Sequence, residues 1–295
     1  MRVFVTGATG FIGAAVVREL QTAGHEVLGL ARSDEGAKFL ASAGAKVHRG
    51  DLEDLDGLRS GAEACDGVIH LAFNHDFSKF AANCEMDRGA VEALGSAIAG
   101  SDRPLVITSG TGMVRTPGRS ATEEDAANVP VPRVASEEAA AALAARGGRV
   151  SVMRLPQVHD TVKQGLISYL IAVAREKGVS AYVGDGLNRW PAVHLLACAQ
   201  LYRLVLEKGL AGARYHAVAE EGVALREIAE VIGRGLKLPV VSISREKAGE
   251  HFGWLAEFVS FDIPASSALT RERMGWQPTG PGLISDLEKM RYLPA

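Results

Sequence analysis

The residues best placed to do chemistry early in the chain are three glycines, Gly7, Gly10 and Gly13. They follow the strand-forming residues 3–5 and precede apolar residues at helical spacing. A glycine turn between a strand and a helix presents backbone N–H groups and the positive end of the helix dipole to an anion. The pattern therefore predicts a dinucleotide diphosphate at this turn. The alternative is an ordinary strand-to-helix turn of another α/β protein.

The type of dinucleotide is predicted from the end of the second expected strand, residues 26–30. Arg32 and Ser33 follow it, at the point where an acidic residue would hold the ribose 2′-hydroxyl of NAD. An arginine there accommodates a 2′-phosphate instead. Asp34 comes next, at the expected start of a helix. The sequence favours NADP(H) over NAD(H), and the alternative is that Arg32 is a solvated surface charge.

Four polar residues follow other expected strands and are candidates for catalysis. Ser109 and Thr111 come after the fifth strand, His75 after the fourth and His159 after the sixth. A hydroxyl can donate a hydrogen bond to a carbonyl, and an imidazole can donate a proton near neutral pH. Because ligands of doubly wound sheets bind at the carboxyl ends of strands, we expect these side chains near the substrate. Structural alternatives remain: the hydroxyls can close the turn, and His75 can be a solvated loop residue.

The same edge of the sheet supplies the expected cofactor contacts. Asp51, after the third strand, can accept from an adenine amino group or cap the helix that begins near residue 54. The residues expected to contact the cofactor are Gly7, Thr9, Gly10, Phe11, Ile12, Gly13, Arg32, Ser33, Asp51, Leu52, Leu71, Ala72, Phe73, Thr108 and Pro156.

These residues are positioned by alternating strands and helices, which predict an α/β, Rossmann-type doubly wound parallel sheet. After Pro156 the alternation weakens into a smaller, partly interleaved α+β lobe. We expect a dinucleotide-binding domain at 1–158 and mainly a substrate-binding lobe at 159–295, with segments that return to the sheet. The expected strands cover residues 3–5, 26–30, 46–48, 67–72, 104–108 and 149–154, with long helices at 78–99 and 133–146 and a long loop at 113–132.

The overall composition excludes several classes of protein. The chain has 295 residues, of which 47% are hydrophobic and 23% charged, as in soluble globular proteins. A net charge of −3 implies no general attraction to nucleic acid. Cys65, Cys84 and Cys198 match no metal-binding spacing and suggest a reducing compartment. No signal peptide or membrane span is apparent, so we expect a cytoplasmic protein with a small-molecule substrate and no metal, nucleic-acid or membrane partner.

Together these segments resemble the extended and atypical branches of the short-chain dehydrogenase/reductase superfamily, the NAD-dependent epimerase/dehydratase family. The resemblance covers essentially the whole chain. It rests on residues 5–13, 50–52, 70–72, 183–186 with Arg189, 267–269 and 274–278. It implies a nicotinamide cofactor, a Ser or Thr that polarises the substrate oxygen, and a Tyr that exchanges the proton. In the family a Lys four residues after this Tyr lowers its pKa and holds the nicotinamide ribose.

This chain departs from the catalytic part of that pattern. The usual Pro-Tyr-x-x-Ser-Lys register falls on residues 132–137, where Arg133 replaces Tyr and Glu137 replaces Lys. A glutamate supplies no cation, and an arginine is a poor proton donor near neutral pH. At helical spacing the two side chains are expected to pair with each other. Strict alignment also places Gly110 at the Ser position, between Ser109 and Thr111.

Three functions follow from the sequence. The leading hypothesis is an NADP(H)-dependent oxidoreductase that transfers a hydride to or from a small carbonyl or alcohol substrate. A nucleotide-sugar epimerase or dehydratase is the first alternative, and the missing Tyr counts against it. The second alternative is a non-catalytic NADP(H)-binding sensor. The resemblance also implies a homodimer through the long helices. Trp190 and Trp254 are expected either in a substrate pocket or in the core.

Overall fold

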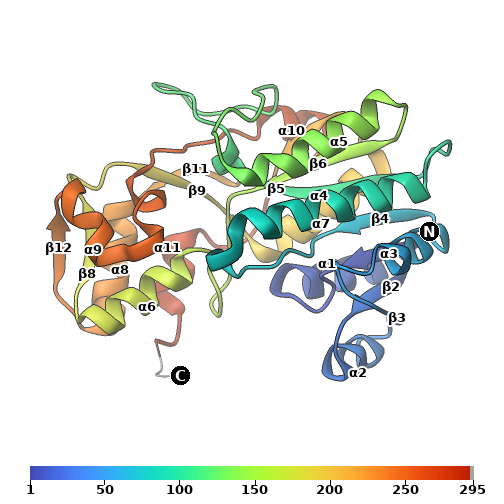
Figure 1. The fold of residues 1–295 in the computed structure, drawn as a ribbon. Helices are drawn as coiled ribbons and strands as arrows, with labels where there is room; N and C mark the ends of the chain where they lie inside the picture. Colours follow the sequence, from blue (N-terminus) through green and yellow to red (C-terminus); the bar gives the residue numbers. More distant parts are fainter. Residues whose placement is uncertain (293–295) are drawn as a thin grey trace.

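The larger lobe is built on a seven-stranded sheet in which every neighbouring pair of strands is parallel. In this computed structural model, which describes residues 1–292, the strand order is β10-β6-β5-β4-β1-β2-β3 (Figure 1). The last three residues expected in the second lobe lie outside the described part. The doubly wound parallel sheet is confirmed. Its strands are β1 (Arg2–Thr6), β2 (Glu26–Ala31), β3 (Lys46–Arg49), β4 (Gly67–His70), β5 (Leu105–Gly110), β6 (Val150–Leu155) and β10 (Arg214–His216).

Helices cover both faces of this sheet, because each parallel connection must cross over a face. The central strands β1 and β4 are buried along almost their whole length, which explains their uninterrupted apolar composition. Figure 1 shows α4 and α5 side by side on one face. One core includes α1 (Phe11–Thr22), α2 (Asp34–Ser42) and α7 (Leu195–Lys208), and the other includes α3 (Leu55–Glu63), α4 (Phe80–Ala97) and α5 (Ala135–Ala145).

Strand β10 and the helices α7 and α10 (Ala268–Met274) come from the second half of the chain but lie with the larger lobe. Strand β10 pairs with β6, and Tyr215 faces Met153 in that register. Helix α7 packs along α1 and buries Leu201 and Tyr202 completely. The second half of the chain therefore contributes to the core beneath the glycine turn.

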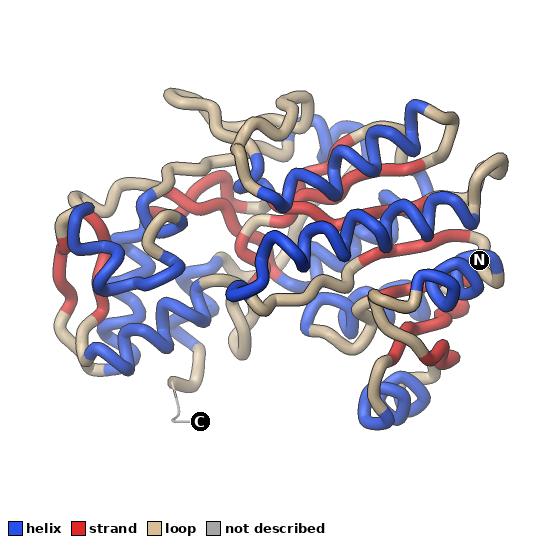
Figure 2. The backbone as a smooth tube through the Cα atoms, in the orientation of Figure 1, coloured by secondary structure: helices blue, strands red, loops and turns tan. Residues whose placement is uncertain are grey.

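The smaller lobe combines helices with two short sheets (Figure 2). A three-stranded sheet of order β11-β9-β7 connects it to the end of β6. A parallel pair, β12 and β8, lies at its far side. The elements are β7 (Gln157–His159), α6 (Ile167–Lys177), β8 (Ser180–Val183), β9 (Arg189–His194), β11 (Glu220–Ala224), α8 (Leu225–Leu236), β12 (Val240–Ile243), α9 (Ala248–Phe252) and α11 (Leu283–Lys289). Among the described residues, no helix is long and apolar enough to cross a bilayer.

The fourth strand ends two residues before the expected position, and the reason is a side chain. The backbone N–H of Ala72 donates to Thr6 Oγ1 at 3.2 Å, and that of Leu71 is shared between Thr6 Oγ1 at 3.2 Å and the Thr6 carbonyl oxygen at 3.3 Å. A short 3-10 turn, η1 (Phe77–Lys79), then precedes α4 and is capped by Asp76. The chain between β4 and α4 is thus a fixed loop that lies over the carboxyl end of the sheet.

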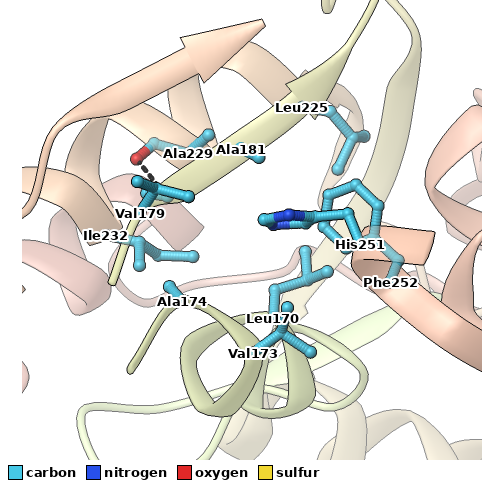
Figure 3. A pocket seen from close by; sticks show the side chains of 11 residues that line it. Leu170, Val173, Ala174, Val179, Ala181, Leu225, Ala229, Ile232, His251 and Phe252 are labelled. Atoms are coloured by element: carbon cyan, nitrogen blue, oxygen red, sulfur yellow. Dashed lines mark hydrogen bonds between the residues drawn. The ribbon is translucent and has the colours of Figure 1, made fainter. Parts of the chain in front are cut away.

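A cavity in the smaller lobe is too small to hold a substrate. It lies between α6, β8, α8 and α9, and its free volume of about 10 Å³ is that of roughly one water molecule. Figure 3 shows the ring of His251 pointing into it, beside Leu170 and Ile232. Burial lowers the pKa of His251. The candidate residues lie instead at the carboxyl edge of the larger sheet.

The packing of α7 against the sheet gives a test of the fold. Replacing the fully buried Leu201 by alanine should lower the free energy of unfolding by about 2–5 kcal/mol, because the cavity left behind is enclosed. Leu196 lies on the same helix but is 64% exposed, so Leu196→Ala should change the free energy of unfolding by less than about 0.5 kcal/mol. Urea unfolding followed by circular dichroism measures both. Equal losses would contradict the burial of α7.

Candidate functional site

The glycine turn between β1 and α1 has no room for side chains at two of its three glycines. Gly7 has a φ of +66°, and a Cβ there would lie 2.7 Å from the backbone nitrogen of Ala72. A Cβ on Gly13 would lie 2.0 Å from the carbonyl oxygen of Gly7. Gly10 caps α1 without any side-chain hydrogen bond. The N–H groups of the first helical turn therefore remain available to an anion, in the geometry that binds diphosphates.

A buried hydrogen-bond chain fixes the loop after β4 against this turn. Thr6 Oγ1 accepts from the N–H groups of Leu71 and Ala72, so its own hydrogen is directed to His70 Nδ1 at 2.7 Å. This assignment leaves the proton of the imidazole on Nε2, which lies 3.1 Å from Asp87 Oδ1. His70 and Asp87 are both 1% exposed. Two expected cofactor contacts, Leu71 and Ala72, are thus held rigidly beside Gly7.

Arg133 completes the chain at the start of α5. Its Nη1 donates to Asp87 Oδ2 at 2.6 Å, and its Nη2 donates to the carbonyl oxygen of Thr108 at 2.8 Å. Ser136 Oγ donates to the same Asp87 oxygen at 2.5 Å. The guanidinium carbon lies 4.4 Å from the centre of the Phe73 ring, a cation–π distance. Arg133 therefore links β5, α4 and the loop after β4.

Glu137, one turn further along, takes a different partner. Its two carboxylate oxygens accept from Arg154 Nε at 2.9 Å and Nη2 at 2.7 Å. Ser109 Oγ donates to the same carboxylate at 2.6 Å. Burial opposes ionisation of Glu137, but the hydrogen bonds and charge of Arg154 outweigh it and hold its pKa below the ordinary value. The expected pairing of Arg133 with Glu137 is wrong, because Arg133 faces α4 whereas Glu137 faces β6.

Arg154 is a residue that the sequence analysis missed. It lies within β6 and is fully buried, where an arginine requires a carboxylate partner. Its Nη1 also donates to the carbonyl oxygen of Asp125 at 2.8 Å, which fixes the long loop before α5. The available signal was an arginine within a largely apolar strand.

The structure places the two hydroxyl candidates, Ser109 and Thr111, in buried positions. Ser109 is 5% exposed, and its hydrogen bond goes to Glu137. Thr111 is 2% exposed, and its Oγ1 lies 3.4 Å from the carbonyl oxygen of Leu155, a long hydrogen bond. Both lie at the carboxyl end of the sheet, close to the Glu137–Arg154 pair.

His159, the third candidate, lies inside the junction between the lobes. It is fully buried, and its Nδ1 lies 2.8 Å from Asp286 Oδ2 on α11. Its Nε2 has Glu220 at 3.9 Å. Burial lowers the pKa of His159, although Asp286 acts in the opposite direction. Within residues 1–292, no three His, Cys, Asp or Glu side chains are grouped to hold a metal ion.

His75, the fourth candidate, is exposed on the loop between β4 and α4. Its ring lies edge-on to Phe73 and Phe77, with ring centres 5.3 and 6.2 Å away. Partial desolvation lowers its pKa, the positive charges of Lys163 and Arg133 act in the same direction, and a hydrogen bond with the Phe73 backbone opposes them. Of the four catalytic candidates, His75 alone has a solvent-exposed side chain.

The second expected strand ends at a pair of arginines rather than one. Arg32 is exposed directly after β2, and Ser33 caps α2 by accepting from the N–H of Gly36 at 3.1 Å. Arg49, at the end of the neighbouring β3, donates to the Ser33 carbonyl oxygen at 2.5 Å and to Asp34 Oδ1 at 2.8 Å. Arg49 was not among the residues expected from the sequence. Its position at the end of the next strand could have indicated it.

The other expected cofactor contacts gather at the same edge of the sheet. Asp51 Oδ1 accepts from the N–H groups of Glu53 and Asp54, at 2.9 and 3.2 Å. The cap of α3 is Asp54 rather than Asp51. The remaining expected contacts, which lie within or after the strands β1, β3, β5 and β6, are Thr9, Phe11, Ile12, Leu52, Thr108 and Pro156.

The ionisation of Asp87 gives a prediction for stability against pH. Burial disfavours its charge, but the hydrogen bond from His70 and the charge of Arg133 together lower its pKa to about 2. Because this pKa is below the unfolded value, the stabilisation is complete above about pH 4 and is lost as the pH falls towards 2. We expect Asp87→Asn to lower the free energy of unfolding by about 3–5 kcal/mol at pH 7.

Urea unfolding between pH 7 and pH 3 measures this effect. The difference in free energy of unfolding between wild type and Asp87→Asn should become smaller as the pH falls below about 4, because protonation of the wild-type carboxyl removes the same charge. Asp102→Asn is a matched control, because Asp102 is 94% exposed and lies 3.8 Å from its arginine partner. If the difference in free energy of unfolding did not change with pH, the lowered pKa of Asp87 would be contradicted.

Comparisons with known proteins identify the family of the chain. Residues 3–218 match the model of the NAD dependent epimerase/dehydratase family. The chain is 49% identical over 294 residues to an uncharacterised protein of Schizosaccharomyces pombe, covering 99% of this chain and 100% of that one. It is 28% identical over 324 residues to a UDP-glucose 4-epimerase of Streptomyces lividans, with 96% and 93% covered. A dTDP-glucose 4,6-dehydratase structure from Streptomyces venezuelae with NAD bound has a TM-score of 0.78 at 20% identity, over 99% and 96% of the two chains. The chain belongs to the NAD dependent epimerase/dehydratase family.

Proposed function

We propose that this protein is an NADP(H)-dependent oxidoreductase that transfers a hydride to or from a small carbonyl or alcohol substrate. The proposal rests on the ion pairs that Arg133 and Glu137 form. Each is held in a buried ion pair, with Asp87 and Arg154 respectively, so neither exchanges protons with a substrate. A nucleotide-sugar epimerase or dehydratase would need a Tyr at the position of Arg133. Hydride transfer needs only a bound nicotinamide and one proton donor.

The cofactor end of the proposal rests on the glycine turn and the two arginines. The N–H groups around Gly10 would hold the diphosphate. Arg32, with Arg49 beside it, would bind the 2′-phosphate that distinguishes NADP(H) from NAD(H). When bound, the nicotinamide supplies or accepts the hydride. The chain itself orients the cofactor and supplies the proton.

For the proton we assign His75. Ser109, Thr111 and His159 are buried and hydrogen-bonded to the protein, whereas the His75 ring reaches the surface. In reduction, a protonated His75 would donate to the carbonyl oxygen, and in alcohol oxidation the neutral ring would accept that proton. Arg133 would act as a positioning residue, because it holds the Phe73 ring beside His75. We assign residues 159–295 mainly to substrate binding.

Cofactor binding can be tested by titrating the protein with NADPH, NADH, NADP⁺ and NAD⁺. Arg32→Ala should weaken NADPH binding by about tenfold or more, because a charged hydrogen bond is lost, and leave NADH binding unchanged. Gly13→Ala should abolish binding of both, whereas Gly89→Ala, at an open position on α4, should alter neither. Equal weakening of NADPH and NADH by Arg32→Ala would contradict NADP(H) preference. Failure of wild type to bind any dinucleotide would overturn the proposed function.

The proton donor can be tested through the pH dependence of carbonyl reduction. The rate at saturating NADPH should fall as the pH rises through the pKa of His75, because only the protonated ring donates. That pKa lies below the ordinary value of 6.5, so the fall should occur on the acidic side of neutrality. His75→Gln should lose this dependence and most of the rate, by about 100-fold or more. An unchanged pH profile in His75→Gln would exclude His75 as the donor.

The same two ion pairs also favour a second function, a non-catalytic NADP(H) sensor. Tight NADPH binding without turnover of any carbonyl compound would support this alternative. A partner protein that is captured in the presence of NADP⁺ but not of NADPH would support the sensor. Equal capture with both forms of the cofactor would exclude the sensor.

A further inference from the structure

Four aromatic side chains connect the two lobes beside the candidate site. Phe77 comes from the loop before α4, and Tyr169, Trp254 and Phe258 come from the smaller lobe. Phe77 stacks on Trp254 with ring centres 4.2 Å apart and an interplanar angle of 16°. Tyr169 and Phe258 lie edge-on to Trp254, at 5.2 and 6.1 Å. Figure 1 shows the first turn of α4 directed towards the lobe that carries α6 and α9. We call these four residues the aromatic bridge.

The aromatic bridge keeps a large part of its surface open. Trp254 is 43% exposed and Tyr169 is 40% exposed. Trp190 and Trp276, by contrast, are 0% and 1% exposed and belong to the cores. Flat aromatic faces that are left in solvent beside a functional site gain stability when another flat ring covers them. The aromatic bridge is therefore an exposed stacking surface rather than a buried core cluster.

The aromatic bridge is continuous with the proposed reaction site. Phe77 lies 6.2 Å from His75, measured between ring centres, and His75 lies 5.3 Å from Phe73. Phe73 in turn carries the Arg133 guanidinium over its face. A path of aromatic rings therefore leads from Trp254 to the proton donor and to the end of β4. A molecule on the aromatic bridge would have its reactive group close to His75.

The rings of the aromatic bridge themselves offer no charge to a diphosphate. The Arg133 guanidinium over Phe73 is already paired with Asp87 at 2.6 Å, and the other positive charge acting on His75 is that of Lys163. A nucleotide diphosphate would require unpaired cations or several free N–H groups. A planar uncharged molecule requires only the ring faces.

We propose that the aromatic bridge binds the organic part of the substrate, and that the substrate is a planar conjugated aldehyde or ketone, such as an aromatic aldehyde. This inference rests on the proposed hydride transfer. The carbonyl carbon gains the hydride that the reduced nicotinamide loses, which leaves the cofactor oxidised. The carbonyl oxygen gains a proton from protonated His75, and water then reprotonates His75.

The test compares benzaldehyde with cyclohexanecarbaldehyde, which has a ring of the same size that is not planar. In the NADPH-dependent assay, Trp254→Ala should raise the KM for benzaldehyde by roughly three- to tenfold, because ring stacking is lost. The KM for cyclohexanecarbaldehyde and both kcat values should change by less than about twofold. Tyr169→Leu should act in the same direction. Phe39→Ala, an exposed aromatic residue on α2, is the matched control and should change neither KM. Equal effects of Trp254→Ala on both aldehydes would overturn the inference.

A second measurement does not depend on turnover. Because Trp190 and Trp276 are buried, benzaldehyde added to the NADP⁺-bound protein should quench mainly the fluorescence of Trp254. The quenching should be saturable and should disappear in Trp254→Phe. No saturable quenching in wild type would overturn the inference, whereas quenching without NADPH oxidation by either aldehyde would overturn only the proposed function.

Sedimentation distinguishes substrate binding from contact between two copies of the chain. If Trp254→Ala dissociates an oligomer and leaves the KM for benzaldehyde unchanged, the aromatic bridge is a protein interface and the inference is wrong. An unchanged oligomeric state together with the raised KM supports it.

Discussion

The contact between Gly13 and the carbonyl of Gly7 is the constraint on which the rest of the structure depends. A Cβ on Gly13 would approach that carbonyl oxygen to 2.0 Å, so α1 can meet β1 closely only because the position is glycine. This close approach brings the start of α1 to the edge of the sheet and leaves its first N–H groups unpaired. The hydrogen bonds from Leu71 and Ala72 to Thr6 then fix the neighbouring loop at the same edge.

The buried charges at the start of α5 form a second layer of organisation. Arg133 with Asp87, and Arg154 with Glu137, are largely held out of water, and removal of any one of them would leave its partner without the opposite charge. Such pairs hold α4, α5 and β6 in one arrangement more than they add to stability. They also occupy the positions at which the resemblance in sequence leads us to expect a Tyr and a Lys. The proton for the chemistry must therefore come from elsewhere, and we propose that it comes from the loop after β4.

That loop relates the site to the smaller lobe. It carries His75 between Phe73 and Phe77, and Phe77 stacks on Trp254 of the smaller lobe. One segment thus touches the buried network through Arg133 and the aromatic surface through Trp254. Because both ends are fixed, the position of His75 depends on packing contributed by distant parts of the chain.

The sequence by itself determined the glycine turn, the alternation of strands and helices, and hence the parallel sheet with its ligand-binding edge. These features are local: a glycine spacing, an apolar run or a helical period is complete within about a dozen residues. The tertiary structure decided the partners of the charges. Arg133 meets Asp87 across 46 positions of the chain, and Glu137 meets the unforeseen Arg154 on β6. It also buried His159 and exposed Trp254. Such outcomes depend on which surfaces the fold brings together. The local pattern of residues does not predict them, because the partners lie far apart in the sequence.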